Sequence, residues 1–220
     1  MAAGKILNSN QQKLLAIISK EKKLCDFFYL TGGTVLAEYY LQHRLSEDLD
    51  FFSEREFDPQ MIFVFWKKVQ KEAGIKKIDF QQSFNRNLFF LRIGREIIKA
   101  EFTYFPFPRI ENKKKIGGLS VDSLIDIAVN KVFTIYQCPR SRDFIDLYFI
   151  LKKEHWTIAD LIRKAKIKFD WHVDALQLGA QFLQATEIKD YPRMIKNIDH
   201  RGWQRFFVRE AKILKNNVLN

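Results

Sequence analysis

The sequence predicts an α+β protein: a mixed or antiparallel sheet with flanking helices, followed by a helical C-terminal region. Three apolar and β-branched runs lie between residues 78 and 105, and short turns rich in Asn or Gly separate them. Another apolar run, residues 49–52, reads as a strand. From residue 121 onward apolar residues recur at helical spacing. We therefore expect a sheet-containing core over residues 1–118 and a helical region over residues 119–220.

The amino-acid composition limits the classes of protein to which this sequence can belong. The 220 residues carry a net charge of +11, are 47% hydrophobic and include 21 Phe, so they can form a substantial core. The positive charge suits a polyanion such as nucleic acid, and a generally basic soluble protein is an equal alternative. Two isolated cysteines, Cys25 and Cys138, form neither a disulfide framework nor a metal set. Isolated cysteines of this kind lead us to expect a cytoplasmic protein. Because no apolar run approaches membrane-spanning length, we expect no membrane partner.

Capping residues, turns and helix-ending glycines indicate where the helices and strands in the first half of the sequence begin and end. A helix over residues 10–22 has Asn8 or Ser9 as its cap, and a short strand over residues 27–30 follows. Thr31-Gly32-Gly33-Thr34 reads as a turn before a helix over residues 35–41. Asp58 and Pro59 open a helix that runs to about residue 72 and stops at Gly74. The expected strands 78–84, 88–93 and 96–105 then form an antiparallel meander beside the strand at residues 49–52.

The second half reads as a linker and a series of helices. Residues 106–118 contain two prolines, a lysine triplet and two glycines, and we expect a linker there. Ser141 and Thr157 are expected helix caps, and Asp170 is expected to open a further helix. The expected helices cover residues 121–136, 142–152, 157–168, 170–186 and 201–217.

Two carboxylates interrupt an apolar run at Asp48-Leu49-Asp50. In a strand these aspartates point to one face, while Leu49 and Phe51 point to the opposite, buried face. Adjacent carboxylates repel each other unless a cation lies between them, and hard oxygen ligands suit Mg²⁺. Upstream, Gly32 and Gly33 let backbone N–H groups approach an anion at a helix start. The pattern predicts a magnesium site that binds a triphosphate, although a Gly-Gly turn or a lone Asp-x-Asp is weak support when taken singly.

The segment TGGTVLAEYYLQHRLSEDLDFF resembles the first motif of the nucleotidyltransferase-like AbiEii/AbiGii toxin family, part of the polymerase-β-type nucleotidyltransferase superfamily. The matching positions are Gly32, Gly33, Thr34, His43, Arg44, Ser46, Asp48, Leu49, Asp50 and Phe51. Residues 125–151 resemble the second signature of the family, a helix with a lysine and then Arg-Asp-x-x-Asp-Leu. The matching positions there are Lys131, Arg142, Asp143, Asp146 and Leu147.

The resemblance implies a nucleotidyltransferase-type sheet and assigns roles to the carboxylates. Asp48 and Asp50 are implied metal ligands and catalytic residues, with Mg²⁺ or Mn²⁺ as the metal. Relatives place a third carboxylate on a neighbouring strand, and Glu101 is the best-placed candidate here, with Asp79 as the fallback. The alternative, judged only from the alternation of apolar and polar residues along the strand, is that Glu101 lies on a face of the sheet exposed to solvent.

The resemblance also places Lys131 and Asp146 among the catalytic residues. Lys131 is implied to neutralise nucleotide phosphates, with Arg142 and Asp143 beside it. Asp146 lies among apolar neighbours and needs a cation, which Lys131 or Arg142 can supply. The alternative is a structural ion pair between two helices. Gly32, Gly33 and Thr34 are the implied phosphate-binding turn.

The implied activity is transfer of a nucleoside monophosphate from a nucleoside triphosphate to an acceptor hydroxyl. Relatives are linked to GTP binding or to nucleotide addition at the 3′ end of tRNA, so RNA is the expected acceptor, with a protein or a small molecule as the alternatives. They are toxins of bacterial toxin–antitoxin or abortive-infection systems, which implies an antitoxin encoded nearby. One alternative is a non-catalytic nucleotide- or RNA-binding protein, and another is a structural partner protein. A basic stripe on the last helix suits an RNA backbone or is a solvated face: Arg201, Arg205, Arg209 and Lys212.

Overall fold

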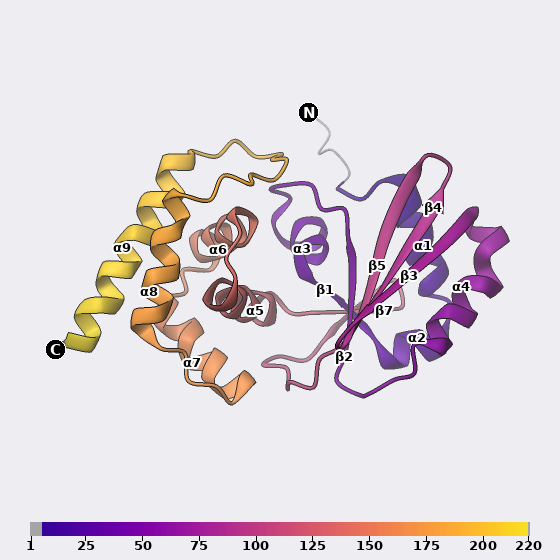
Figure 1. Ribbon diagram of the computed structural model, residues 1–220, viewed down its shortest axis with the longest axis horizontal. Helices are drawn as coiled ribbons and strands as arrows, with labels where there is room; N and C mark the ends of the chain where they lie inside the picture. The colour runs from indigo at the N-terminus through magenta and orange to yellow at the C-terminus, as the bar shows by residue number, and fades with distance from the viewer. Residues whose placement is uncertain (1–5, 220) are drawn as a thin grey trace. The chain divides into compact units, whose positions relative to one another are not determined.

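The computed structural model describes residues 6–219 and divides into two compact units. The first unit comprises Met1–Tyr40, Leu45–Pro108 and Asn112–Ser123, and the second comprises Leu41–Arg44, Arg109–Glu111 and Leu124–Asn220. Figure 1 shows the sheet in the first unit and the C-terminal helices in the second.

The first unit contains a sheet with strand order β3-β4-β5-β2-β1-β7-β6. Its strands are β1 (Tyr29–Thr31), β2 (Leu49–Ser53), β3 (Ile75–Ser83), β4 (Arg86–Ile93), β5 (Glu96–Tyr104), β6 (Lys114–Ile116) and β7 (Leu119–Val121). Strand β2 pairs with β5 in parallel, as does β1 with β7, whereas the other pairs are antiparallel. The predicted mixed sheet and its β3–β4–β5 meander are therefore confirmed.

The aromatic core of the first unit lies on one face of this sheet. Phe102 is fully buried, and its ring lies 4.8 Å from that of Phe51 and 5.0 Å from that of Phe28, measured between centroids. Trp66 packs edge-on against Phe102 from helix α4 (Gln60–Ala73). Helices α1 (Ser9–Ile18) and α2 (Lys22–Phe27) also belong to this unit. This packing leaves the alternate residues of β2 and β5 on the opposite face.

Two predicted helix ends of the first unit are confirmed in detail. Asn8 caps α1 in a capping box, because its side chain accepts from the Gln11 backbone N–H while the Gln11 side chain accepts from the Asn8 N–H. Gly74 ends α4 with φ of +76°, a left-handed conformation that glycine adopts without strain.

The sheet extends beyond the predicted linker. Residues 114–116 form β6, and Gly117 and Gly118, both with positive φ, turn the chain into β7. Strand β7 pairs with β1, so residues 119–123 lie in the first unit rather than in the helical region. The helix expected from residue 121 therefore starts later, at Leu124, because the preceding residues are held in the sheet.

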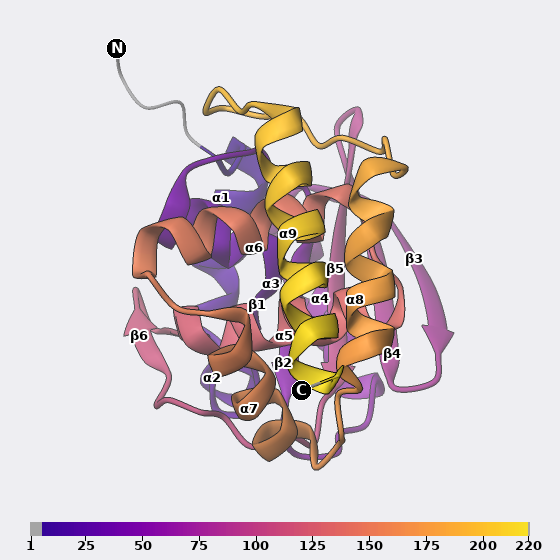
Figure 2. The same ribbon diagram turned by 90° about the vertical axis from the view of Figure 1, so that its left-hand side faces the viewer.

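The second unit is helical. Its elements are α5 (Leu124–Gln137), α6 (Ser141–Glu154), α7 (Ile158–Phe169), α8 (Ala175–Leu183), the 3₁₀ helix Gln184–Thr186 and α9 (His200–Leu219). Figure 2 shows α8 and α9 running side by side. Phe144 of α6, Phe182 of α8 and Phe207 of α9 form the buried aromatic core between these helices.

The helix predicted to start at Asp170 starts later. Asp170 has φ of +46° and ends α7, and the Asp174 carboxylate caps α8 by accepting from the backbone N–H of Gln177 at 2.7 Å. Within residues 6–219, no helix has the length and apolar character needed to cross a membrane.

Candidate active site

Asp50 and Glu101 are neighbours in the sheet of the first unit. Asp50 lies on β2 and Glu101 on β5, and the two are paired in the parallel register. Leu49 and Phe51 are buried on the opposite face, as the alternation predicts. Asp48 immediately precedes β2 and is half-buried. The sheet therefore places Asp50 and Glu101 side by side on one face.

Glu101 is not on a solvated face, so that alternative is wrong. Its side chain is buried and accepts two hydrogen bonds from the Arg86 guanidinium, at 2.6 and 2.8 Å, and one from the Thr103 hydroxyl at 3.1 Å. Burial alone raises the pKa of Glu101, but the hydrogen bonds and charge of Arg86 outweigh it and lower the pKa overall. Glu101 is therefore ionised and held in position.

Asp79, the fallback for the third carboxylate, lies elsewhere in the sheet. It is on the edge strand β3, from which β4 and β5 separate the Asp50 strand. Its carboxylate forms a 2.7 Å ion pair with the largely exposed Lys77. Of the two candidates, Glu101 is the one beside Asp50.

Lys99 also belongs to this group, although no sequence motif includes it. Its Nζ lies 2.8 Å from Oδ2 of Asp48 and 3.5 Å from Oε2 of Glu101. Burial lowers the pKa of Lys99, but the hydrogen bond and charge of Asp48, with the other carboxylates, raise the pKa overall. The strand alternation was the available signal, because Lys99 is two residues before Glu101 and shares its face.

The donor set of this group suits a hard divalent cation, because Asp48, Asp50 and Glu101 all offer carboxylate oxygens. Over the described residues, however, no three acidic, His or Cys side chains form a ready-made metal cage. Lys99 and Arg86 neutralise the carboxylates instead. The residue types therefore fit a metal chemically, and Arg86 and Lys99 are the present partners of Glu101 and Asp48.

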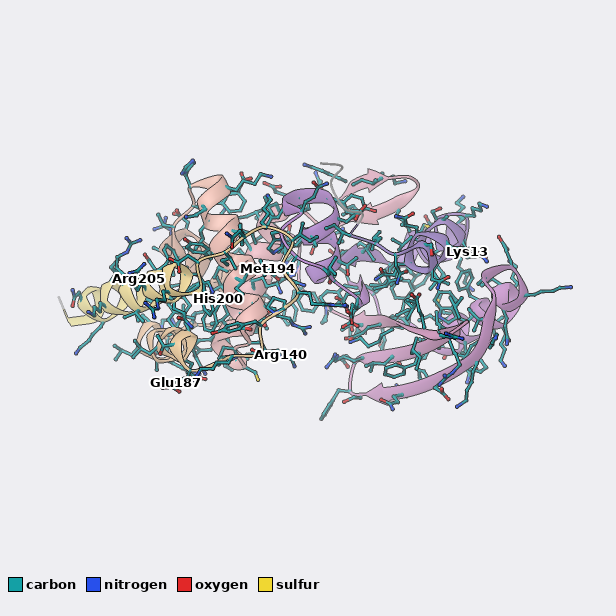
Figure 3. The ribbon with its side chains drawn as sticks, turned by 90° about the horizontal axis from the view of Figure 1, so that it is seen from above. Lys13, Arg140, Glu187, Met194, His200 and Arg205 are labelled. Atoms are coloured by element: carbon teal, nitrogen blue, oxygen red, sulfur yellow. The ribbon has the colours of Figure 1, made fainter. Side chains whose placement is uncertain are left out.

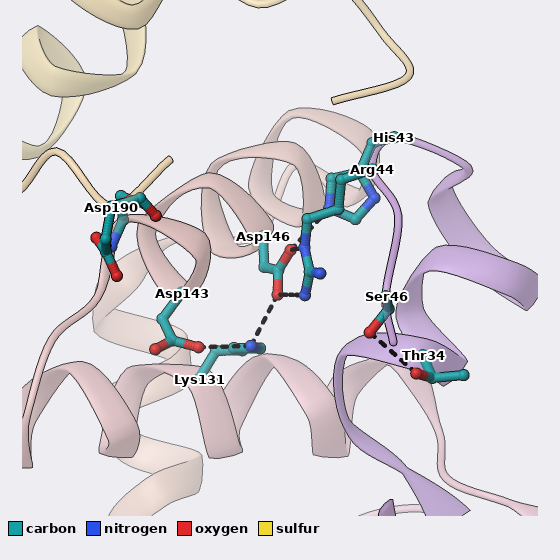
Figure 4. Close-up of polar contacts among 9 residues, drawn as sticks. Thr34, His43, Arg44, Ser46, Lys131, Asp143, Asp146 and Asp190 are labelled. Carbon is teal, nitrogen blue, oxygen red and sulfur yellow. Dashed lines mark hydrogen bonds and ion pairs between the residues drawn. The ribbon is translucent and has the colours of Figure 1, made fainter. Parts of the chain in front are cut away.

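The Gly-Gly-Thr turn is built against the strand that carries Asp50. Gly32 has φ of +75°, and a Cβ added there would lie 2.5 Å from Oδ2 of Asp50, so only glycine fits. Helix α3 (Gly32–Val35) starts at this residue and continues in π form over Leu36–Leu41, earlier than predicted. The buried Thr34 hydroxyl hydrogen-bonds to the Asp48 carbonyl and, at 2.9 Å, to the Ser46 hydroxyl (Figure 4). These contacts tie the turn to Asp48 and Asp50.

A second polar cluster lies in the helical unit around Asp146. Asp146 is completely buried on α6, and its Oδ1 accepts hydrogen bonds from His43 Nε2 at 2.7 Å and Arg44 Nε at 2.6 Å. Its Oδ2 contacts a terminal guanidinium nitrogen of Arg44 at 2.8 Å and Lys131 Nζ at 2.7 Å. Lys131 also donates to Asp143 at 2.6 Å, so it joins α5 to two residues of α6 (Figure 4).

The charges of this cluster explain its protonation states. Burial raises the pKa of Asp146, but Arg44 and Lys131 outweigh it and hold the pKa well below its ordinary value. Burial lowers the pKa of Lys131, and the charges of Asp143 and Asp146 raise it overall. For His43 burial dominates, so its pKa is lowered despite the bond to Asp146. The cluster therefore contains two cations, two carboxylates and a neutral histidine at neutral pH.

His43 and Arg44 are matched motif positions to which the sequence analysis gave no role. Besides contacting Asp146, the backbone carbonyl of His43 accepts from the N–H groups of Ile195 and Lys196 at 2.9 and 3.0 Å. Arg44 forms a backbone bridge with Met194. Residues 41–44 are thereby joined to α6 and to the segment before α9.

The start of α6 differs from prediction. Ser141 is the first residue of the helix rather than its cap, and its backbone N–H donates to Asp190 Oδ1 at 2.9 Å. The Ser141 hydroxyl donates to the Asp190 carbonyl at 2.6 Å. A carboxylate from a distant segment therefore caps the helix that carries Arg142, Asp143 and Asp146. Arg142 itself is half-buried.

The two groups of residues lie in different units. Asp48, Asp50, Glu101 and the Gly-Gly-Thr turn belong to the first unit. Lys131, Arg142, Asp143 and Asp146 belong to the second, together with His43 and Arg44.

Known proteins resemble this chain in sequence and in fold. An uncharacterized protein of Aquifex aeolicus (strain VF5), aq_aa25, is 33% identical over 150 residues, which cover 66% of this chain and 68% of the relative. The crystal structure of JHP933 from Helicobacter pylori superimposes with a TM-score of 0.60 at 22% identity, over 94% of this chain and 91% of that one. A second Helicobacter pylori crystal structure, provisionally named a nucleotidyltransferase, gives 0.58 at 22% identity, over 96% and 97%.

The family comparison covers most of the chain. Residues 13–211 match the model of the family described as "Nucleotidyl transferase AbiEii toxin, Type IV TA system". This range includes both sequence motifs and spans both units. The chain therefore belongs to the AbiEii nucleotidyltransferase toxin family.

Proposed function

We propose that this protein is a metal-dependent nucleotidyltransferase that transfers a nucleoside monophosphate from a nucleoside triphosphate to an RNA hydroxyl, the 3′ end of tRNA. The observation that carries the proposal is the pairing of Asp50 with Glu101 on one sheet face, with Asp48 two residues before Asp50. Family membership supports a role as the toxin of a toxin–antitoxin pair, with an antitoxin as the proposed partner.

The transfer exchanges one phosphorus–oxygen bond for another. The acceptor oxygen bonds to the α-phosphorus, the bond from that phosphorus to the α–β bridging oxygen breaks, and pyrophosphate leaves. A carboxylate of the Asp48, Asp50 and Glu101 group accepts the hydroxyl proton. The same three residues would hold Mg²⁺ or Mn²⁺, which when bound supplies positive charge to the attacking and leaving oxygens.

Lys131 neutralises the phosphates in this proposal. Its side chain is 11% exposed, and Asp143 and Asp146 orient its ammonium group through contacts of 2.6 and 2.7 Å. All four contacts of Asp146 are made within the protein, so its role is to position Lys131 and Arg44. Gly32 and Gly33 offer backbone N–H groups to the triphosphate, Thr34 supports that turn, and Arg142 and Asp143 complete the nucleotide site.

Charge supports RNA as the acceptor. The chain has a net charge of +11, and α9 carries an exposed basic stripe: Arg201, Arg205, Arg209 and Lys212. Arg205 is 77% exposed and lies on α9 in Figure 3. Such residues bind a phosphate backbone without reading its sequence.

A labelling experiment tests the proposal. The protein is incubated with Mg²⁺, total tRNA and each of the four nucleoside triphosphates in turn, labelled at the α-phosphate. The proposal predicts that label moves to RNA and that EDTA stops the transfer. Absence of labelling with every triphosphate contradicts it.

The second candidate function is nucleotide or RNA binding without transfer. It is favoured by one observation: Glu101 and Asp146 are already saturated by contacts within the protein. This candidate predicts that Mg²⁺ and a triphosphate raise the melting temperature while no label reaches RNA.

A further inference from the structure

The ammonium group of Lys99 lies among the carboxylates that we propose as metal ligands. Its ammonium lies 2.8 Å from Asp48 and 3.5 Å from Glu101, and the charge of Asp50 also acts on it. Only 23% of its side chain is exposed, whereas the side chain of Lys77, in an ion pair on the same sheet, is 63% exposed. The contacts of Lys99 therefore converge on carboxylates rather than on solvent.

Each of these carboxylates is a proposed metal ligand. An ammonium and a divalent cation compete for the same oxygen lone pairs, because both bind carboxylates through charge. Arg86 already donates to both oxygens of Glu101, at 2.6 and 2.8 Å. A divalent cation can reach Asp48 and Glu101 together only after Lys99 withdraws from them.

We propose that Lys99 is the resident counter-cation of the carboxylate group and that a divalent metal ion displaces it. This inference rests on the metal site of the proposed function. It adds a specific device: Lys99 keeps Asp48 and Glu101 neutralised in the metal-free protein and thereby lowers the affinity for the metal. The exchange is a competition between two cations and involves no covalent step.

Variants of Lys99 test the competition through metal binding alone. Mn²⁺ binding is measured by electron paramagnetic resonance with the purified protein, without nucleotide or RNA. Lys99→Met removes the competing charge and is expected to bind Mn²⁺ about tenfold more tightly than the wild type. Lys99→Arg keeps a cation and is expected to bind no more tightly than the wild type.

Lys77→Met is the matched control. It removes a lysine that forms a 2.7 Å ion pair with Asp79 on the same sheet but does not contact Asp48 or Glu101. Its Mn²⁺ affinity is expected to equal that of the wild type. Without metal, Lys99→Met is expected to melt at a lower temperature than Lys77→Met, and Mn²⁺ is expected to reverse that order.

A second measurement uses the wild type and does not depend on any variant folding. Lysines are labelled with an amine-reactive ester with and without Mn²⁺, and each site is quantified by mass spectrometry. Displacement predicts that Mn²⁺ raises the labelling of Lys99 severalfold and leaves Lys77 unchanged, because only Lys99 loses its carboxylate partner.

The outcomes separate this inference from the proposed function. Equal Mn²⁺ affinity in the wild type and Lys99→Met, with metal bound in both, overturns the inference alone, as does unchanged labelling of Lys99 under saturating Mn²⁺. Absence of Mn²⁺ binding in both proteins overturns the inference and also removes the metal from the proposed function.

Discussion

Arg44 contacts Asp146 through two hydrogen bonds, of 2.6 and 2.8 Å, although 102 residues separate them in the sequence. The contact joins a residue of the first sequence motif to a residue of the second. Lys131, from the helix before, completes the ion cluster on the same carboxylate. His43 and Arg44 of the first motif therefore form one buried polar cluster with Lys131 and Asp146 of the second.

Asp146→Asn is expected to destabilise the protein strongly. The change removes the charge that compensates Arg44 and Lys131, and loss of one partner of a buried ion pair costs about 3–5 kcal/mol. Urea unfolding followed by circular dichroism measures the effect. Asp79→Asn is the control, because Asp79 pairs with Lys77 at the surface, and we expect little change there. Equal stability of the two variants would show that the Asp146 cluster does not hold the helices together.

His43 is expected to make the protein less stable as the pH falls through the pKa that histidine has in the unfolded chain. Burial lowers its pKa in the folded protein, whereas its pKa in the unfolded chain is about 6.5. The unfolded state therefore binds more protons, and stability falls as the pH drops through about 6.5 toward the folded pKa. Asp146 does not contribute in this window, because its pKa is well below its ordinary value, so its stabilisation is lost only at lower pH, below about 4.

The His43 prediction is checked with urea unfolding at several pH values. His43→Gln, which can still donate to Asp146, should flatten the dependence, while His172→Gln at the exposed His172 should leave it unchanged. A slope that persists in His43→Gln would assign the pH dependence to other groups.

Gly32→Ala is expected to impair both stability and transfer. The residue has φ of +75°, and the added methyl would lie 2.5 Å from the Asp50 carboxylate, which must then move. Gly94→Ala separates the two effects, since Gly94 has φ of +61° with no atom within 4 Å of an added Cβ. We expect about 1–2 kcal/mol of backbone strain in both variants and a loss of transfer only in Gly32→Ala. Melting curves and labelling rates measure these effects, and full transfer by Gly32→Ala would show that Asp50 is not needed where it lies.

Much of the fold could be predicted because it follows from local sequence. The capping box at Asn8, the stop at Gly74 and the alternation along β5 each depend on neighbouring residues. The strand β7 could not be predicted in this way. Two of its three residues pair with β1, 91 positions earlier, and no local signal records that partner.

The same distinction between local sequence and distant partners applies to the residues of the candidate site. Its carboxylates and Lys131 could be found, because they match motifs of consecutive residues. The residues that contact and position them could not be found in this way. Arg86 on β4 donates to Glu101 on the neighbouring strand β5, and Asp190 caps α6 although it lies 49 residues after Ser141. Lys99 lies between these cases, since alternation placed it on the face of Glu101 but did not show that it contacts Asp48.

The central claim is that the Asp48 and Asp50 pair supports nucleotidyl transfer. It is tested most directly by comparing the rate of label transfer from a nucleoside triphosphate to tRNA in the wild type, Asp50→Asn and Asp79→Asn, at equal protein concentration and with matched melting curves. The account predicts that Asp50→Asn, which keeps the size of the side chain but removes its charge, lowers the rate at least about 100-fold, by analogy with removal of a charge-stabilising group. Asp79→Asn, on the distant edge strand, should keep the wild-type rate. Wild-type transfer by a folded Asp50→Asn protein would contradict the account.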